Sequence, residues 1–163
     1  SYFSGEIDLS ALYFSLMAFL IVVFLFLSYE VLYNRIIDRE RTTNGTGYMM
    51  IHVFLIFALN NISVALEFMR EAEVTLLPKT LFLTGSFVLY FVFLFLTGLY
   101  AKGSCSFPRR FLILLIGIGL SFIALMLVFR THMYVNIAVT VIYVLGIFLL
   151  LYRRGKMITG EER

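Results

Sequence analysis

The chain of 163 residues contains no tryptophan, one cysteine and two prolines. A single cysteine excludes a disulfide framework and any four-cysteine metal site. Only 14% of the residues are charged, against about 25% in a soluble domain, whereas 61% are hydrophobic. A soluble sphere of this size could not hide so much apolar side chain from water. The composition therefore excludes a soluble globular domain, a disordered chain and a nucleic-acid-binding protein, although the net charge is +3.

Five long apolar runs account for most of the chain. Each run is about as long as the roughly 20 residues that a helix needs to cross a bilayer. The runs are continuous, which excludes the short alternating strands of a membrane barrel. We therefore expect an all-α integral membrane protein, a bundle of five transmembrane helices forming one membrane domain over residues 1–163. The predicted helices cover about 9–33, 48–69, 80–101, 110–129 and 133–152.

The basic residues between the runs predict an orientation, because cytoplasmic loops of membrane proteins are enriched in Lys and Arg. One side would carry ten of these residues and the other only three. We expect the N-terminus outside and the C-terminus in the cytoplasm, with the cell membrane as the location. The ten are Arg35, Arg39, Arg41, Lys102, Arg109, Arg110, Arg153, Arg154, Lys156 and Arg163, and the three are Arg70, Lys79 and Arg130.

Polar side chains recur on one face of the helix predicted over 48–69. The spacing along the sequence places four polar residues on one side of the helix: His52, Asn60, Ser63 and Glu67. Asn61 lies beside this face. Such groups are costly in hydrocarbon, so we expect this face to point into the bundle, with Asn60 bonded to Asn136 or Thr140 of the last helix. The stripe would either line a solute or proton path, or join helices by hydrogen bonds.

Glu30 is the other charged residue inside a span, near the same membrane face as His52. A carboxylate beside an imidazole would form a proton or ion site, so a Glu30–His52 pair is one interpretation. In the other, Glu30 extends to the interface and pairs with Arg35 or Arg39.

The remaining helices carry weaker patterns. Small residues at Gly117, Ser121 and Ala124 predict a seam where another helix approaches closely. No catalytic pattern, metal-ligand spacing or cofactor motif is recognisable, so we expect no enzyme activity, metal or cofactor. Polar faces are also predicted for the third helix, with Ser86, Tyr90 and Thr97, and for the fifth, with Asn136, Thr140 and Tyr143.

Several short segments appear in an order that is typical of one family. They are LSYEVLY at 27–33, GYMMIH at 47–52, VALEF at 64–68, FVLY at 87–90 and PRR at 108–110. In this order the chain resembles the C-terminal half of the low temperature requirement protein A family of bacterial membrane proteins. The resemblance implies that His52 and Glu67 are the family's histidine and glutamate. The family's N-terminal Glu-Leu-Phe-Phe-Asp-like segment is absent, which implies a fragment of a longer chain or a half-length relative.

Two functions fit these features. The first is a transporter or channel-like domain for a small solute or ion, with a water-filled cavity that reaches Asn60. The alternative is a non-catalytic structural or sensor subunit of a homo-oligomer or larger membrane complex, with polar residues turned outward and a dry core. A lipid-modifying enzyme is less well supported, because no spacing unites Glu30, His52 and Glu67.

Overall fold

The computed structural model describes residues 9–36, 45–71, 73–100 and 107–159. These residues form five long helices, each long and apolar enough to cross a membrane, as the apolar runs predict. Of the residues used to predict the orientation, Arg39, Arg41, Lys102 and Arg163 lie outside the described ranges. The helices are α1 (Leu9–Val31), α2 (Gly45–Phe68), α3 (Leu76–Leu96), α4 (Arg109–Val128) and α5 (Met133–Thr159).

The helix ends differ from the predicted ends where charge or proline interrupts an apolar run. Helix α3 begins at Leu76 and has Pro78 in its first turn, where the missing N–H needs no helical partner. Helix α5 continues to Thr159 and has Lys156 in its last turn, where a cation interacts favourably with the helix dipole. Two short segments extend the helices, a π-helix at Leu32–Ile36 after α1 and a 3₁₀ helix at Thr97–Tyr100 after α3.

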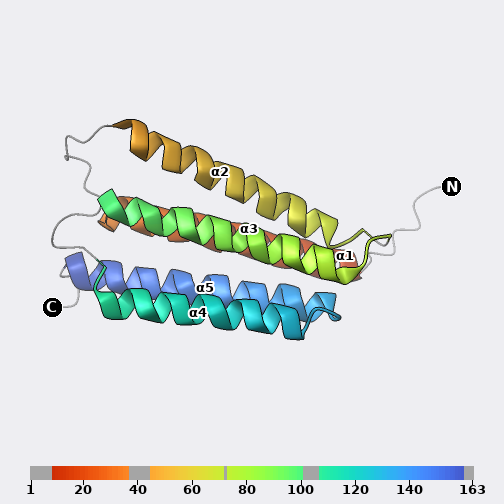
Figure 1. Ribbon diagram of the computed structural model, residues 1–163. Coiled ribbons are helices and arrows are strands. Elements are labelled where there is room, and N and C mark those ends of the chain that lie inside the picture. Colours follow the sequence, from red (N-terminus) through yellow and green to blue (C-terminus); the bar gives the residue numbers. More distant parts are fainter. Residues whose placement is uncertain (1–8, 37–44, 72, 101–106, 160–163) are drawn as a thin grey trace.

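The five helices lie side by side, with α2 at one edge of the bundle and α4 and α5 at the other (Figure 1). Helix α2 packs mainly along α3, and α1 packs mainly along α5, whereas α1 and α2 contact each other much less. Helix α4 covers α5 and part of α3. Helix α3 is the most buried of the five, and α1 and α4 are the most exposed.

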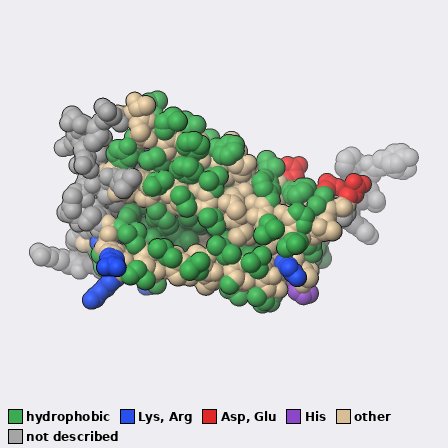
Figure 2. All heavy atoms as spheres, in the orientation of Figure 1, with side chains coloured by type: hydrophobic (Ala, Val, Ile, Leu, Met, Phe, Trp, Pro, Cys, Tyr) green, Lys and Arg blue, Asp and Glu red, His purple; other side chains and the backbone are tan. Residues whose placement is uncertain are grey.

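The core between the helices is apolar, and so is the outer surface. Figure 2 shows hydrophobic side chains over most of the surface between the two ends of the bundle, as expected for a lipid-facing wall. The largest fully buried side chains come from all five helices: Ile21, Leu25, Leu32, Ile62, Met69, Leu83, Phe87, Tyr90, Leu94, Met126 and Ile137.

Charged side chains gather at the two ends of the bundle (Figure 2). We call the end where α2 and α4 begin the basic end, and the opposite one the far end. Among the described side chains, the basic end carries Arg109, Arg110, Arg153, Arg154, Lys156 and Glu30, and the far end carries Glu67, Glu71, Glu73, Arg70, Lys79 and Arg130.

Candidate functional site

The polar face predicted on α2 points away from the core over most of its length. Asn60, Ser63 and Glu67 are exposed on the surface of the bundle, while His52 and Asn61 are half-buried. The prediction that this face lies inside the bundle is therefore wrong for the three exposed residues. The physical reason is that the opposite face of α2 is the one that packs, through the buried residues Leu55, Ala58, Ile62, Ala65, Leu66 and Met69.

The exposed polar groups on α2 make few bonds to the other residues that the structure describes. The Ser63 hydroxyl donates to the carbonyl oxygen of Leu59 in its own helix, at 3.2 Å. Among the described residues, Asn136 and Thr140 have other partners and do not bond Asn60. Asn60 therefore presents its amide at the surface, where hydrocarbon would supply neither a donor nor an acceptor.

A groove of about 440 Å³ lies beside this face, between α1 and α2. Ser63 and Glu67 line it from α2, Arg70 lines it from the turn that follows, and the small residues that line it from α1 are Ser15 and Ala18. The guanidinium of Arg70 lies over the ring of Phe14, 5.6 Å from its centroid. The groove exists because α1 and α2 separate here, each packing mainly on a different neighbour.

The predicted Glu30–His52 pair is not formed. The Glu30 carboxylate instead accepts a hydrogen bond from the Asn34 amide, one turn along the same helix. His52 bonds the residue next to Glu30, with 2.8 Å between its Nε2 and the Tyr29 hydroxyl. Successive helical residues point about 100° apart, so Tyr29 faces α2 whereas Glu30 is exposed.

The bonds of His52 assign its tautomer. Its Nδ1 lies 2.9 Å from the carbonyl oxygen of Tyr48, and a carbonyl can only accept a hydrogen bond. In the neutral ring Nδ1 must therefore carry the proton, so Nε2 accepts the hydrogen bond that the Tyr29 hydroxyl donates. This bond joins α1 to α2 at a place where the two helices otherwise have little contact.

Further tyrosines surround this histidine near the basic end. The ring of Tyr48 lies 4.2 Å from His52 and 5.3 Å from Tyr100, between centroids. Gly47 allows the approach of Tyr100, because a Cβ at position 47 would lie only 2.6 Å from that hydroxyl. The sequence pattern did not predict these partners of His52, although the tyrosine-rich end of the first predicted helix could have indicated them.

The polar residues predicted on the third and fifth helices are buried in the core except Tyr143, which is half-buried. Asn136 Nδ2 donates to Thr80 Oγ1 at 3.2 Å and so joins α5 to α3. The Tyr90 hydroxyl donates to the carbonyl oxygen of Leu25 at 2.7 Å and joins α3 to α1. The Thr140 hydroxyl donates to the carbonyl of Asn136 at 2.8 Å. These three donors are bonded within the bundle, as helices in lipid require, whereas the buried Oδ1 of Asn136 has no partner among the described residues.

The small-residue seam predicted on α4 does not form a close helix contact. Gly117 and Ala124 are exposed, and a Cβ at Gly117 would have nothing within 4 Å. Ser121 does reach α5, since its hydroxyl lies 2.8 Å from the Tyr143 hydroxyl. The seam is wrong for Gly117 and Ala124 because α4 packs through large side chains instead: Leu115, Phe122 and Met126.

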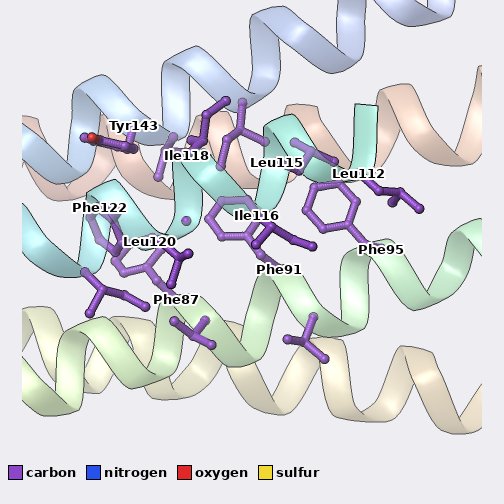
Figure 3. Close-up of a pocket in the computed structure, with 16 residues that line it drawn as sticks. Phe87, Phe91, Phe95, Leu112, Leu115, Ile116, Ile118, Leu120, Phe122 and Tyr143 are labelled. Carbon is purple, nitrogen blue, oxygen red and sulfur yellow. The ribbon is translucent and has the colours of Figure 1, made fainter. Parts of the chain in front are cut away.

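A second groove, the α3–α4 groove, has a volume of about 340 Å³ and lies between these two helices over α5 (Figure 3). Its walls are almost entirely apolar, and the Tyr143 hydroxyl, paired with Ser121, lies at one end. Phe87, Phe91 and Phe95 line it from α3, and Leu112, Ile116 and Gly119 from α4. Within the described ranges, no three His, Cys, Asp or Glu side chains come together to hold a metal ion.

Comparison of the chain with family models, with curated proteins and with solved structures gives no match. The low temperature requirement protein A family therefore remains a prediction from short segments of the sequence, and the candidate sites are defined by the geometry of the chain alone.

Proposed function

We propose that the chain is a non-catalytic membrane subunit that assembles with a second copy of itself through the polar face of α2. The observation that carries this proposal is the exposure of Asn60, in line with Ser63 and Glu67, on a surface that is mainly apolar. In hydrocarbon the Asn60 amide is costly without a polar partner, whereas the Ser63 hydroxyl bonds its own helix and Glu67 lies among the charged residues of the far end. Another transmembrane surface supplies such a partner, and lipid chains do not.

A second copy suits this face because an asparagine can bond to itself. An amide offers both a donor and an acceptor, and a two-fold axis places identical residues opposite one another. Asn60 from two chains would then pair across the axis. The adjoining groove between α1 and α2, with small side chains at Ser15 and Ala18, offers space for a helix of the second copy to approach closely.

Transport by a single chain is the less favoured function. That function requires the polar stripe of α2 to border an interior path, whereas Asn60 lies outside the bundle. The enclosed centre of the described bundle is filled by large apolar side chains such as Ile62, Phe87 and Met126. A path lined by the α2 stripe would therefore need the second copy to close it.

Cross-linking tests the proposed contact. In a chain with Cys105→Ser, which removes the single cysteine, Asn60→Cys should give a disulfide-linked dimer when oxidised in native membranes. Ala124→Cys is the matched control, because Ala124 is exposed on α4 and lies equally far from the start of its helix. Dimer formation at Asn60→Cys that is no greater than at Ala124→Cys would contradict the proposal.

A second measurement concerns the strength of the contact. Asn60→Leu should weaken dimerisation by about 0.6–2 kcal/mol, the usual size of a membrane hydrogen bond, or roughly 3- to 30-fold in the dissociation constant. Energy transfer between labelled chains, followed as lipid is added, measures this change. Ile56→Leu, one turn away and also exposed, should leave the dissociation constant unchanged.

We also propose that the basic end faces the cytoplasm of a bacterial cell, because basic residues are retained on that side. Cys105 belongs to the segment of the sequence that connects α3 to α4. It should then resist an impermeant thiol reagent in intact cells and react after the cells are lysed. Labelling of Cys105 in intact cells would show that the orientation is the opposite of the one proposed.

A further inference from the structure

The α3–α4 groove is open to the surroundings of the bundle and follows the direction of the helices (Figure 3). On α4, its lining runs from Leu112 to Ile123, which corresponds to about 16 Å at 1.5 Å per residue. One leaflet of a bilayer has a hydrocarbon thickness of about 15 Å, half of the roughly 30 Å core. The groove therefore has the length of one lipid chain from one leaflet.

The chemistry of the walls selects the part of a ligand that can enter. Phe87, Phe91 and Phe95 lie on one side, and the α4 side chains on the other side are aliphatic except Phe122. The Ser121 hydroxyl donates to the carbonyl oxygen of Ile118 at 2.8 Å, so the Tyr143 hydroxyl donates to Ser121, also at 2.8 Å, and the inner end offers no free O–H donor to a ligand. A hydrocarbon chain fits these walls, whereas a polar solute would lose its hydration without compensation.

The charge at the outer end selects the headgroup. Phe95 and Leu112 lie at the end of the groove nearest the basic end (Figure 3). Arg109, Leu112, Ile116 and Gly119 follow one another at steps of three and four and so share one face of α4. Arg109 is exposed there, one turn before the groove begins, and a guanidinium is well suited to bind a phosphate.

We propose that the α3–α4 groove binds one acyl chain of an anionic glycerophospholipid, with the lipid phosphate at Arg109. The exposed side chain of Arg110 adds positive charge at the same helix end. The site lies on the face formed by α3 and α4, so it is independent of the α2 surface through which the chain is proposed to dimerise.

The absence of tryptophan makes a sharp test possible. Phe91→Trp places the single tryptophan of the variant in the groove and replaces one aromatic ring by another. In vesicles, brominated phosphatidylglycerol should quench this tryptophan with an apparent affinity at least fivefold higher than brominated phosphatidylcholine, since each arginine near a membrane surface contributes roughly fivefold. Phe26→Trp, on the exposed surface of α1, should respond equally to both lipids.

Two glycines of α4 supply matched variants. Gly119 lines the groove, whereas Gly117 is exposed outside it, and a Cβ at either position would have nothing within 4 Å. In the Phe91→Trp chain, Gly119→Phe should abolish the preference for phosphatidylglycerol and Gly117→Phe should keep it. Arg109→Gln should reduce the preference by roughly fivefold. Equal quenching by both lipids, or a preference that Gly119→Phe leaves intact, would overturn the proposal.

Discussion

Replacing Tyr90 by alanine is expected to destabilise the bundle by about 3–5 kcal/mol, the usual loss for a large aromatic side chain in a packed core. Tyr90 is fully buried in α3, the most buried helix. Its ring lies 5.3 Å from that of Phe91, between centroids, and its hydroxyl reaches the carbonyl oxygen of Leu25 in α1. The substitution therefore removes both a core side chain and a bond between helices. Reversible unfolding in mixed detergent micelles measures the loss.

The conservative change Tyr90→Phe separates the two contributions. It keeps the ring and removes only the hydroxyl, so the expected loss is about 0.5–1.5 kcal/mol, the net size of one hydrogen bond. If Tyr90→Ala and Tyr90→Phe had the same free energy of unfolding, the contribution of the ring to stability would be contradicted.

Reversing the charge of Lys79 should have an effect of similar size. Lys79 is only 3% exposed, and its ammonium group donates to the carbonyl oxygens of Met69 and Glu71, just after the end of α2. Carbonyl groups at a helix C-terminus attract a cation and repel an anion. We expect Lys79→Glu to lower the free energy of unfolding by about 3–5 kcal/mol, as for other uncompensated buried charges.

Two further variants of Lys79 test this interpretation. Lys79→Arg retains the charge and the donors and should cost much less than Lys79→Glu in the same unfolding measurement. Lys79→Met removes the charge but not the apolar stem, and an intermediate loss of about 1–3 kcal/mol is expected because the carbonyl groups lose their donor. Equal stability of the arginine and glutamate variants would contradict the role given to the charge.

The number of helices could be predicted because lipid imposes one simple requirement, an uninterrupted apolar run of sufficient length. The helix ends were less predictable, since charge ends an apolar run without ending a helix. Arg153 and Arg154 show this at the end of α5, which continues to Thr159. Lys79 shows it at the start of α3, which begins at Leu76 and also includes Pro78 in its first turn.

The direction in which each helix faces could not be predicted. In a soluble protein the apolar face of a helix identifies the core, but in a membrane both the core and the surroundings are apolar. The face of α2 with Ala58 and Ile62 was therefore indistinguishable in sequence from a lipid-facing one. The same ambiguity explains why Glu30 was predicted as the neighbour of His52 and Tyr29 is the neighbour found. The two residues are adjacent, so a rotation of α1 by one residue decides which of them faces α2.

The pairing of α1 with α5 has a consequence for the synthesis of the protein. Roughly 100 residues separate the two helices, so a ribosome that adds about 5–20 residues per second needs about 5–20 s to provide the partner of α1. In a bilayer, α1 is expected to be stable as a single helix until α5 has been made, because its backbone groups are bonded internally. Helices α2 and α3 are consecutive and can associate in the meantime. We therefore expect α1 to acquire its main neighbour after α2, α3 and α4 have been made, and the arrival of α5 to complete the bundle.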